Sequence, residues 1–176
     1  MPPIWVTTKA QAAATRVDPV VVARQAVKRL TLPSPIIEMA PPAGSTQLIG
    51  LATWLWTGPA MWRTATATAS AGTVRATATA TPVKVVWDMG DGHSVTCDGP
   101  GMPYDPTDSN ATTDCQYTWS HGGTYQTTAA IFWKVTWTAT GAAGGGNFGL
   151  IAGPAARVAV RVTESQAVNT PTVQGA

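Results

Sequence analysis

The clearest pattern along the chain is a period of two, in which apolar and polar residues alternate as they do along a half-buried β-strand. The longest example covers residues 124–139, where Ile131, Trp133, Val135 and Trp137 all fall on one face. Shorter alternating or apolar segments, bounded by glycine and proline, predict further strands at residues 36–39, 47–57, 63–70, 73–81, 83–88, 93–97, 115–119 and 155–163. These strands, with turn signals between them, predict an all-β fold, an antiparallel sandwich of two sheets.

One segment has helical spacing instead. Asp18 can cap a helix, Pro19 suits its first turn, and an apolar stripe of valine and alanine continues to Leu30. Pro33 and Pro35 then end the helical pattern. Such a short helix is not stable alone, so we expect it to dock on the sheets.

The same patterns suggest how the chain is organised. We expect residues 1–17 to be a flexible lead-in and residues 164–176 to be a disordered tail. Residues 18–62 should form a helix-and-strand segment that packs on a β-sandwich of residues 63–163. The glycine-rich stretch 141–149 contains a GxGxxG pattern, but a strand pattern rather than a helix follows it, which indicates a flexible hairpin loop and not a dinucleotide site.

Composition narrows the class of protein. Charged residues make up only 11% of the chain and the net charge is +2, which excludes the strongly basic surface of a dedicated nucleic-acid binder. The longest apolar runs fall well short of the roughly 20 residues that cross a bilayer, so we expect no transmembrane segment. Nothing in the sequence indicates a cofactor.

The two cysteines, Cys97 and Cys115, are predicted to form a disulfide across a loop rich in glycine and proline. A disulfide, together with the scarcity of lysine, favours an extracellular or cell-surface location. The first residues do not have the basic and apolar regions of a signal peptide, so this location requires that a leader was removed. A cytosolic protein with two free thiols is the alternative.

The most conspicuous motif is Trp-Asp-Met-Gly-Asp-Gly. Trp87 ends an alternating strand and should be a core residue. Asp88 and Asp91 can accept hydrogen bonds from backbone N–H groups in a tight turn, while Gly90 and Gly92 allow positive φ. These residue types predict an architectural role for the motif rather than a catalytic one.

This motif resembles the W-D-F-G-D-G signature of PKD domains. Further along, Tyr117 in residues 115–119, and Tyr125 in the G-T-Y segment, resemble the second half of that signature. The resemblance covers roughly residues 65–163 and implies an immunoglobulin-like β-sandwich. The cysteine pair, the glycine-rich stretch and the long loop at residues 98–114 depart from the family pattern.

The complete layout, which includes Thr-Trp-Leu-Trp at residues 53–56, also resembles uncharacterised secreted or surface proteins of high-GC Gram-positive bacteria. This resemblance implies a location more than an activity. We therefore expect a non-catalytic module whose partner is a protein or a cell-envelope polymer and not a nucleic acid. Edge strands and the 98–114 loop are the expected contacts, because loops on a rigid scaffold usually carry recognition.

Two other functions remain open. Trp54, Trp56 and Trp62 lie close together in the sequence; we expect them to be buried, but if exposed they could stack on sugars in a carbohydrate-binding module. An unrecognised hydrolase is the third reading, although no nucleophile lies in a G-x-S-x-G motif. We expect the polar residues of the acidic loop to be solvated turn residues. The alternative hypothesis is a weak calcium site with oxygen ligands from Asp105, Asp108, Asn110 and Asp114.

Overall fold

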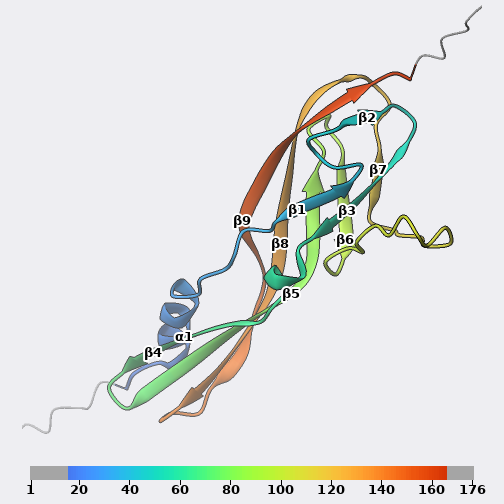
Figure 1. The fold of residues 1–176 in the computed structure, drawn as a ribbon. Helices are drawn as coiled ribbons and strands as arrows, with labels where there is room; N and C mark the ends of the chain where they lie inside the picture. Colours follow the sequence, from blue (N-terminus) through green and yellow to red (C-terminus); the bar gives the residue numbers. More distant parts are fainter. Residues whose placement is uncertain (1–15, 166–176) are drawn as a thin grey trace, which may run out of the picture.

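Three long strands run through the molecule that the computed structural model describes over residues 16–165 (Figure 1). They are β5 (Val74–Asp88), β8 (Gly123–Thr140) and β9 (Gly145–Thr163), and β8 lies between the other two and antiparallel to both. The 18 residues of β8 extend about 60 Å at the usual rise of a strand. The alternation in β8 buries one face, as its sequence predicts, with Ile131 and Trp133 completely inaccessible.

Shorter strands complete this large sheet. The order is β2 (Thr46–Leu48), β9, β8, β5 and β4 (Ala65–Ala71). Strand β6 (Ser94–Asp98) pairs with the second half of β5, whereas β4 pairs with the first half. The large sheet is therefore extended by different strands at its two ends.

A second, three-stranded sheet covers one end of the large sheet. It consists of β1 (Ile37–Ala40), β3 (Ala52–Thr57) and β7 (Gln116–Thr118), with β3 in the centre, and a short 3₁₀ helix, η1 (Pro59–Met61), follows β3. The main core lies between the sheets, where Met39 and Leu55 from the small sheet join Trp87, Ile131 and Trp133 from the large one.

Helix α1 (Pro19–Lys28) covers the other end of the large sheet, beside β4 (Figure 1). Its N-terminus is capped as expected, because the Asp18 carboxylate accepts a hydrogen bond of 2.8 Å from the N–H of Val20. Ala23 and Ala26 on its buried face belong to a second apolar cluster with Ala78 and Trp137 of the sheet. A helix on one half and a second sheet on the other give the molecule two cores along the same long strands.

Within the described residues, the predicted fold is confirmed at the level of a mostly β protein with two sheets and one α-helix. Residues 47–57, expected as a single strand, form two strands in different sheets. Residues 49–51 turn between them, where the N–H of Leu51 bonds to the carbonyl of Leu48 and Gly50 has a φ of +76°. By contrast, residues 73–81 and 83–88 form one strand, because a bulge between Pro82 and Val85 lets β5 continue past a residue that cannot donate a hydrogen bond.

The expectation that residues 141–149 form a flexible loop is wrong for residues 145–149, which belong to β9. Glycine there makes room for a large neighbour, because a β-carbon on Gly146 would come within 3.1 Å of the indole of Trp137. The Phe148 ring stacks on the same indole with a centroid distance of 6.0 Å. The lead-in and tail expected at the two ends lie almost wholly outside the described residues.

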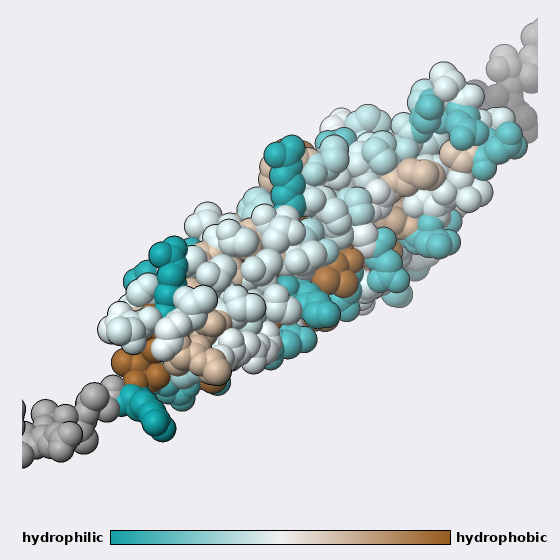
Figure 2. Space-filling model, turned by 90° about the horizontal axis from the view of Figure 1, so that it is seen from below, coloured by the Kyte–Doolittle hydropathy of each residue, from teal (hydrophilic) through white to brown (hydrophobic). Residues whose placement is uncertain are grey.

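Residues 18–62 provide the helix and contribute strands to both sheets. Over residues 16–165, no helix has the length and apolar character required to span a bilayer. The visible surface is mostly of intermediate hydropathy with scattered polar side chains (Figure 2), as a chain with 11% charged residues would predict.

Candidate functional site

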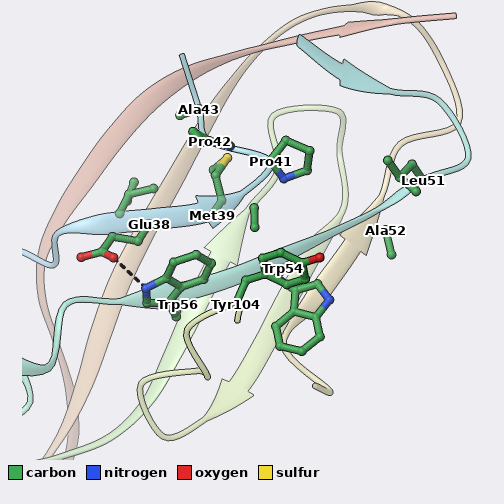
Figure 3. A pocket seen from close by; sticks show the side chains of 12 residues that line it. Glu38, Met39, Pro41, Pro42, Ala43, Leu51, Ala52, Trp54, Trp56 and Tyr104 are labelled. Atoms are coloured by element: carbon green, nitrogen blue, oxygen red, sulfur yellow. Dashed lines mark hydrogen bonds between the residues drawn. The ribbon is translucent and has the colours of Figure 1, made fainter. Parts of the chain in front are cut away.

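An open cavity of about 850 Å³ lies on the outer face of the three-stranded sheet (Figure 3). We call it the aromatic groove. Most of its lining is apolar and includes Leu51, Pro41 and Pro42, together with Trp54, Trp56 and Tyr104. Alternation along β3 explains this composition, because Leu55 points into the core and the two tryptophans on either side point outward.

The pairing of β1 with β3 builds one wall of the aromatic groove. Glu38 lies opposite Trp56, and Ala40 lies opposite Trp54. The indole N–H of Trp56 donates a hydrogen bond of 2.7 Å to Oε2 of Glu38, shown as a dashed line in Figure 3. Trp56 is only 9% exposed, so this pair forms a fixed wall.

The 98–114 loop supplies the other aromatic side chain. The ring of Tyr104 meets that of Trp54 edge to face, with centroids 5.2 Å apart and planes at 78°. Tyr104 is nevertheless 47% exposed, so an open notch lies beside the two perpendicular rings. Figure 3 shows this pair at one end of the groove and the Glu38–Trp56 pair at the other.

The beginning of this loop is held directly against β3. The carbonyl of Pro100 accepts a 2.8 Å hydrogen bond from the N–H of Thr57, and Gly101 bridges to Trp56. Gly101 has a φ of +82°, and a β-carbon there would come within 2.8 Å of the Cα of Trp56. Glycine is therefore required at this close approach, which brings Tyr104 to the groove.

The disulfide between Cys97 and Cys115, predicted from the sequence, is confirmed and closes the same loop. Cys97 belongs to β6 of the large sheet, while Cys115 precedes β7 of the small sheet. The carbonyl of Cys115 also accepts a 2.9 Å hydrogen bond from the N–H of Leu55. Both ends of the loop are thus attached to the structure, and the disulfide joins the two sheets.

A buried amide holds Pro41 and Pro42, which form the proline rim of the groove. The Nε2 atom of Gln47 donates to the carbonyls of Pro41 and Pro42, at 3.0 and 3.1 Å, and its Oε1 accepts a 3.0 Å bond from the hydroxyl of Thr53. Gln47 is completely inaccessible to solvent. Because a buried amide is costly unless it is paired, these three bonds keep the proline turn in one position.

The electrostatic character of the aromatic groove is negative. Glu38 is its one charged lining residue, since neither lysine nor arginine lines it. The loop that supplies Tyr104 also carries Asp105, Asp108 and Asp114. Hydrogen bonds from the side chain and backbone of Thr107 lower the pKa of the exposed Asp105.

The three tryptophans expected to cluster do not all meet. Trp54 and Trp56 line the groove, whereas Trp62 is half-buried and packs against the main core. Tyr104, Leu51 and the two prolines also line the groove, and the sequence pattern did not predict them as site residues. Tyr104 and the prolines lie outside the alternating segments, and Leu51, expected within a strand, lies in the turn between β2 and β3. The side chains of Tyr104 and Leu51 are exposed in the folded chain.

The Trp-Asp-Met-Gly-Asp-Gly motif forms a turn between β5 and β6. Trp87 is fully buried in the core between the sheets. Asp88 accepts a 2.9 Å hydrogen bond from the N–H of Gly90, whose φ is +82°. A β-carbon on Gly90 would come within 2.7 Å of the carbonyl oxygen of Gln126. The carboxylate of Asp88 is therefore used in the turn.

Asp91 connects this turn to β7. Its carboxylate accepts hydrogen bonds from the hydroxyl of Tyr117 at 2.6 Å and from the N–H of His93 at 3.1 Å. Burial acts to raise the pKa of Asp91, but these bonds outweigh it and hold the pKa below its ordinary value. Burial, together with the bond to Asp91, raises the pKa of Tyr117 to about 12. Tyr125 makes a different contact, donating to the carbonyl of His121 at 3.0 Å.

In the acidic loop, Asp105 and Asp108 accept hydrogen bonds from the N–H groups of Thr107 and Asn110 in local turns. Within residues 16–165, no group of three or more histidine, cysteine, aspartate or glutamate side chains is placed to hold a metal ion.

The hydroxyl of Ser120 and Nδ1 of His121 are 2.8 Å apart. Both residues are exposed in the turn before β8. They are adjacent in the chain, and outside the aromatic groove.

Comparison with known proteins identifies no relative: no family model, curated protein or solved structure matches this chain. The resemblance to PKD domains therefore remains a prediction from the motifs. The aromatic groove and its supporting hydrogen bonds are the structural basis for a functional proposal.

Proposed function

We propose that the chain is a non-catalytic, secreted or cell-surface PKD-like module that binds a protein or a cell-envelope polymer. The observation that carries this proposal is the aromatic groove. Ligand-binding clefts are typically a few hundred to about 1,000 Å³ in volume and mostly apolar, with a small number of placed polar groups. The groove has this size and this composition.

The chemistry of the groove supports binding rather than catalysis. Its one carboxylate, Glu38, already accepts a hydrogen bond from Trp56. The two aspartates of the conspicuous turn are likewise engaged by Gly90, His93 and Tyr117. These carboxylates therefore already accept hydrogen bonds that stabilise the fold.

The fold supports the proposed PKD-like character, and the disulfide supports the proposed secreted or cell-surface location. Two sheets that enclose Trp87 agree with a PKD-like sandwich, as does the turn tied to Tyr117. A disulfide is maintained in oxidising surroundings, which supports secretion or surface display.

Carbohydrate binding is the second candidate. It is favoured by the exposed ring of Tyr104 next to Trp54, because aromatic faces can stack on sugar rings. The hydrolase reading has no comparable observation in its favour.

The proposal can be tested by cosedimentation of the full chain with envelope fractions from Gram-positive bacteria. We expect saturable binding that the Trp54→Ala variant loses and the Leu150→Ala variant retains, because Leu150 is exposed on β9, outside the groove. Protease treatment of the fractions separates protein partners, which are destroyed, from polysaccharides, which persist. Absence of binding to every fraction, or equal binding by both variants, would contradict the proposal.

A further inference from the structure

We propose that the aromatic groove binds a proline-rich, positively charged peptide segment in the polyproline II conformation. This inference rests on the proposed binding function and names the class of ligand. Extended proline-rich segments are recognised in grooves lined by aromatic side chains, because the ligand is already ordered and loses little entropy on binding.

The shape of the groove fits such a segment. Trp54 and Tyr104 stand nearly perpendicular to each other at one end, and their edge-to-face contact leaves part of each ring exposed. A proline ring is compact and apolar, so it can contact both rings in this notch. Leu51, which is 48% exposed, extends the apolar surface for a neighbouring aliphatic side chain.

The charges around the groove select a cationic ligand. Glu38 is the charged group of the lining. An arginine or lysine beside the prolines would complement this carboxylate, whereas an acidic peptide or an anionic polymer would be repelled. This polarity distinguishes the preferred ligand from teichoic or uronic acids.

The groove is also held in place before a ligand binds. Gln47 fixes the prolines of the rim, the bond to Glu38 fixes Trp56, and the disulfide closes the loop of Tyr104. A pre-organised groove pays less conformational entropy on binding, which makes micromolar affinity attainable for a short segment.

The composition of the lining favours a peptide over a glycan. Two prolines and Leu51 offer apolar surface rather than hydrogen-bonding groups, and one oxygen of Glu38 is occupied by Trp56. A sugar chain needs many polar partners to replace the water on its hydroxyl groups. A proline-rich segment needs fewer, because each proline lacks an N–H group.

The test is fluorescence anisotropy with a labelled peptide that alternates proline with leucine and carries an arginine at each end. We expect micromolar binding by the intact chain, weakened about tenfold or more by Trp54→Ala or Tyr104→Ala. Leu150→Ala is the matched control and should bind within about twofold of the wild type. Circular dichroism of each variant verifies that it is folded.

Three further probes test the chemistry. Replacing the two arginines of the peptide by glutamates should abolish binding. Replacing its prolines by glycines should lower the affinity of the peptide about tenfold. The Glu38→Gln variant keeps a side-chain oxygen that can accept the hydrogen bond from Trp56, so the groove should stay intact. Its affinity for the arginine peptide should fall about threefold, because the negative charge is lost. Rising salt should weaken binding to the wild type more than binding to this variant.

Carbohydrate binding is tested in parallel, by measuring the binding of cellohexaose and N-acetylchitohexaose to the same variants. Glycan binding that depends on Trp54, without peptide binding, would overturn the peptide inference while leaving the proposed binding function standing. Peptide binding that is equal in Trp54→Ala and wild type would also overturn it. Failure of the proposed function itself would appear separately, as loss of all binding to envelope fractions.

Discussion

At the scale of single residues, carboxylates and amides in this protein mainly hold turns and loops in place. Gln47 secures the proline rim, Glu38 secures Trp56, and Asp91 ties the turn after β5 to Tyr117 of β7. Each is a polar side chain with at least one partner in a different strand or loop. The apolar surface of the aromatic groove therefore depends on hydrogen bonds made behind and beside it.

Replacing Tyr117 by phenylalanine tests the bond to Asp91. We expect the wild type to be more stable by about 1 kcal/mol near neutral pH, the usual contribution of such a hydrogen bond. Because the pKa of Tyr117 is raised to about 12 in the folded protein, this advantage should be complete below about pH 10 and be lost as the pH rises through the folded value.

The ionisation of Asp91 determines how the stability contribution of the Tyr117–Asp91 hydrogen bond changes at low pH. The pKa of Asp91 is lowered in the folded protein, so the stability contribution is present above about pH 4 and is lost as the pH falls through the folded pKa. Urea denaturation of both proteins across this pH range measures the difference. A difference that does not change between neutral pH and pH 12 would show that the phenol is not perturbed by folding.

At the scale of elements, the 98–114 loop is the segment most dependent on its attachments. The loop has no regular secondary structure between Gly101 and Cys115, yet it carries Tyr104 of the groove. The disulfide and the contact of Gly101 with β3 hold its two ends.

Removing the disulfide with the double variant Cys97→Ala and Cys115→Ala should lower the free energy of unfolding by about 3 kcal/mol, as loop closure predicts for a span of this length. The melting temperature should fall by roughly 6–12 °C. Calorimetry measures the shift, and limited proteolysis should show new cleavage between the two positions. An unchanged melting temperature with an uncut loop would indicate that the remaining contacts suffice.

At the scale of the whole molecule, the long strands join two halves with different cores. The half between the sheets buries Trp87, Trp119 and Trp133, together with Leu55 and Ile131. The half under α1 is packed mainly with alanine and valine around Trp137. Small side chains bury less apolar area, so the helical half should be the less stable one.

Side chains in the middle and at the C-terminal end of α1 attach it to the sheet. Arg29 donates a 2.9 Å hydrogen bond to the carbonyl of Thr68 in β4, and the guanidinium of Arg24 lies 5.7 Å from the centre of the Phe148 ring in β9. Both contacts are at the surface, where each contributes little. They orient the helix without making its half as stable as the sandwich.

Hydrogen exchange followed by mass spectrometry tests this difference between the halves. We expect the amides of α1 to exchange about tenfold faster or more than those of β5 near Val85 and Trp87, because the helix can open without breaking the main core. Equal exchange in both regions would instead show a single cooperative unit. The Asp18→Ala variant, which loses the helix cap, should widen the difference.

Much of this architecture could be predicted from the order of residues. The alternation in residues 124–139 determined which face of β8 is buried, Asp18 and Pro19 marked the start of α1, and the cysteines identified their own partners. These features depend on local periodicity or on a unique pair of side chains, so a single sequence contains enough information to predict them.

Other features were decided only by tertiary structure. The turn at residues 49–51 sends β2 and β3 to different sheets, and the Pro82 bulge joins two predicted strands into one. The aromatic groove likewise combines β1, β3 and a distant loop, and it separates Trp62 from the other two tryptophans. Which strands pair, and which loop folds over them, depends on contacts between residues far apart in the chain, and the local pattern of residues does not specify those contacts.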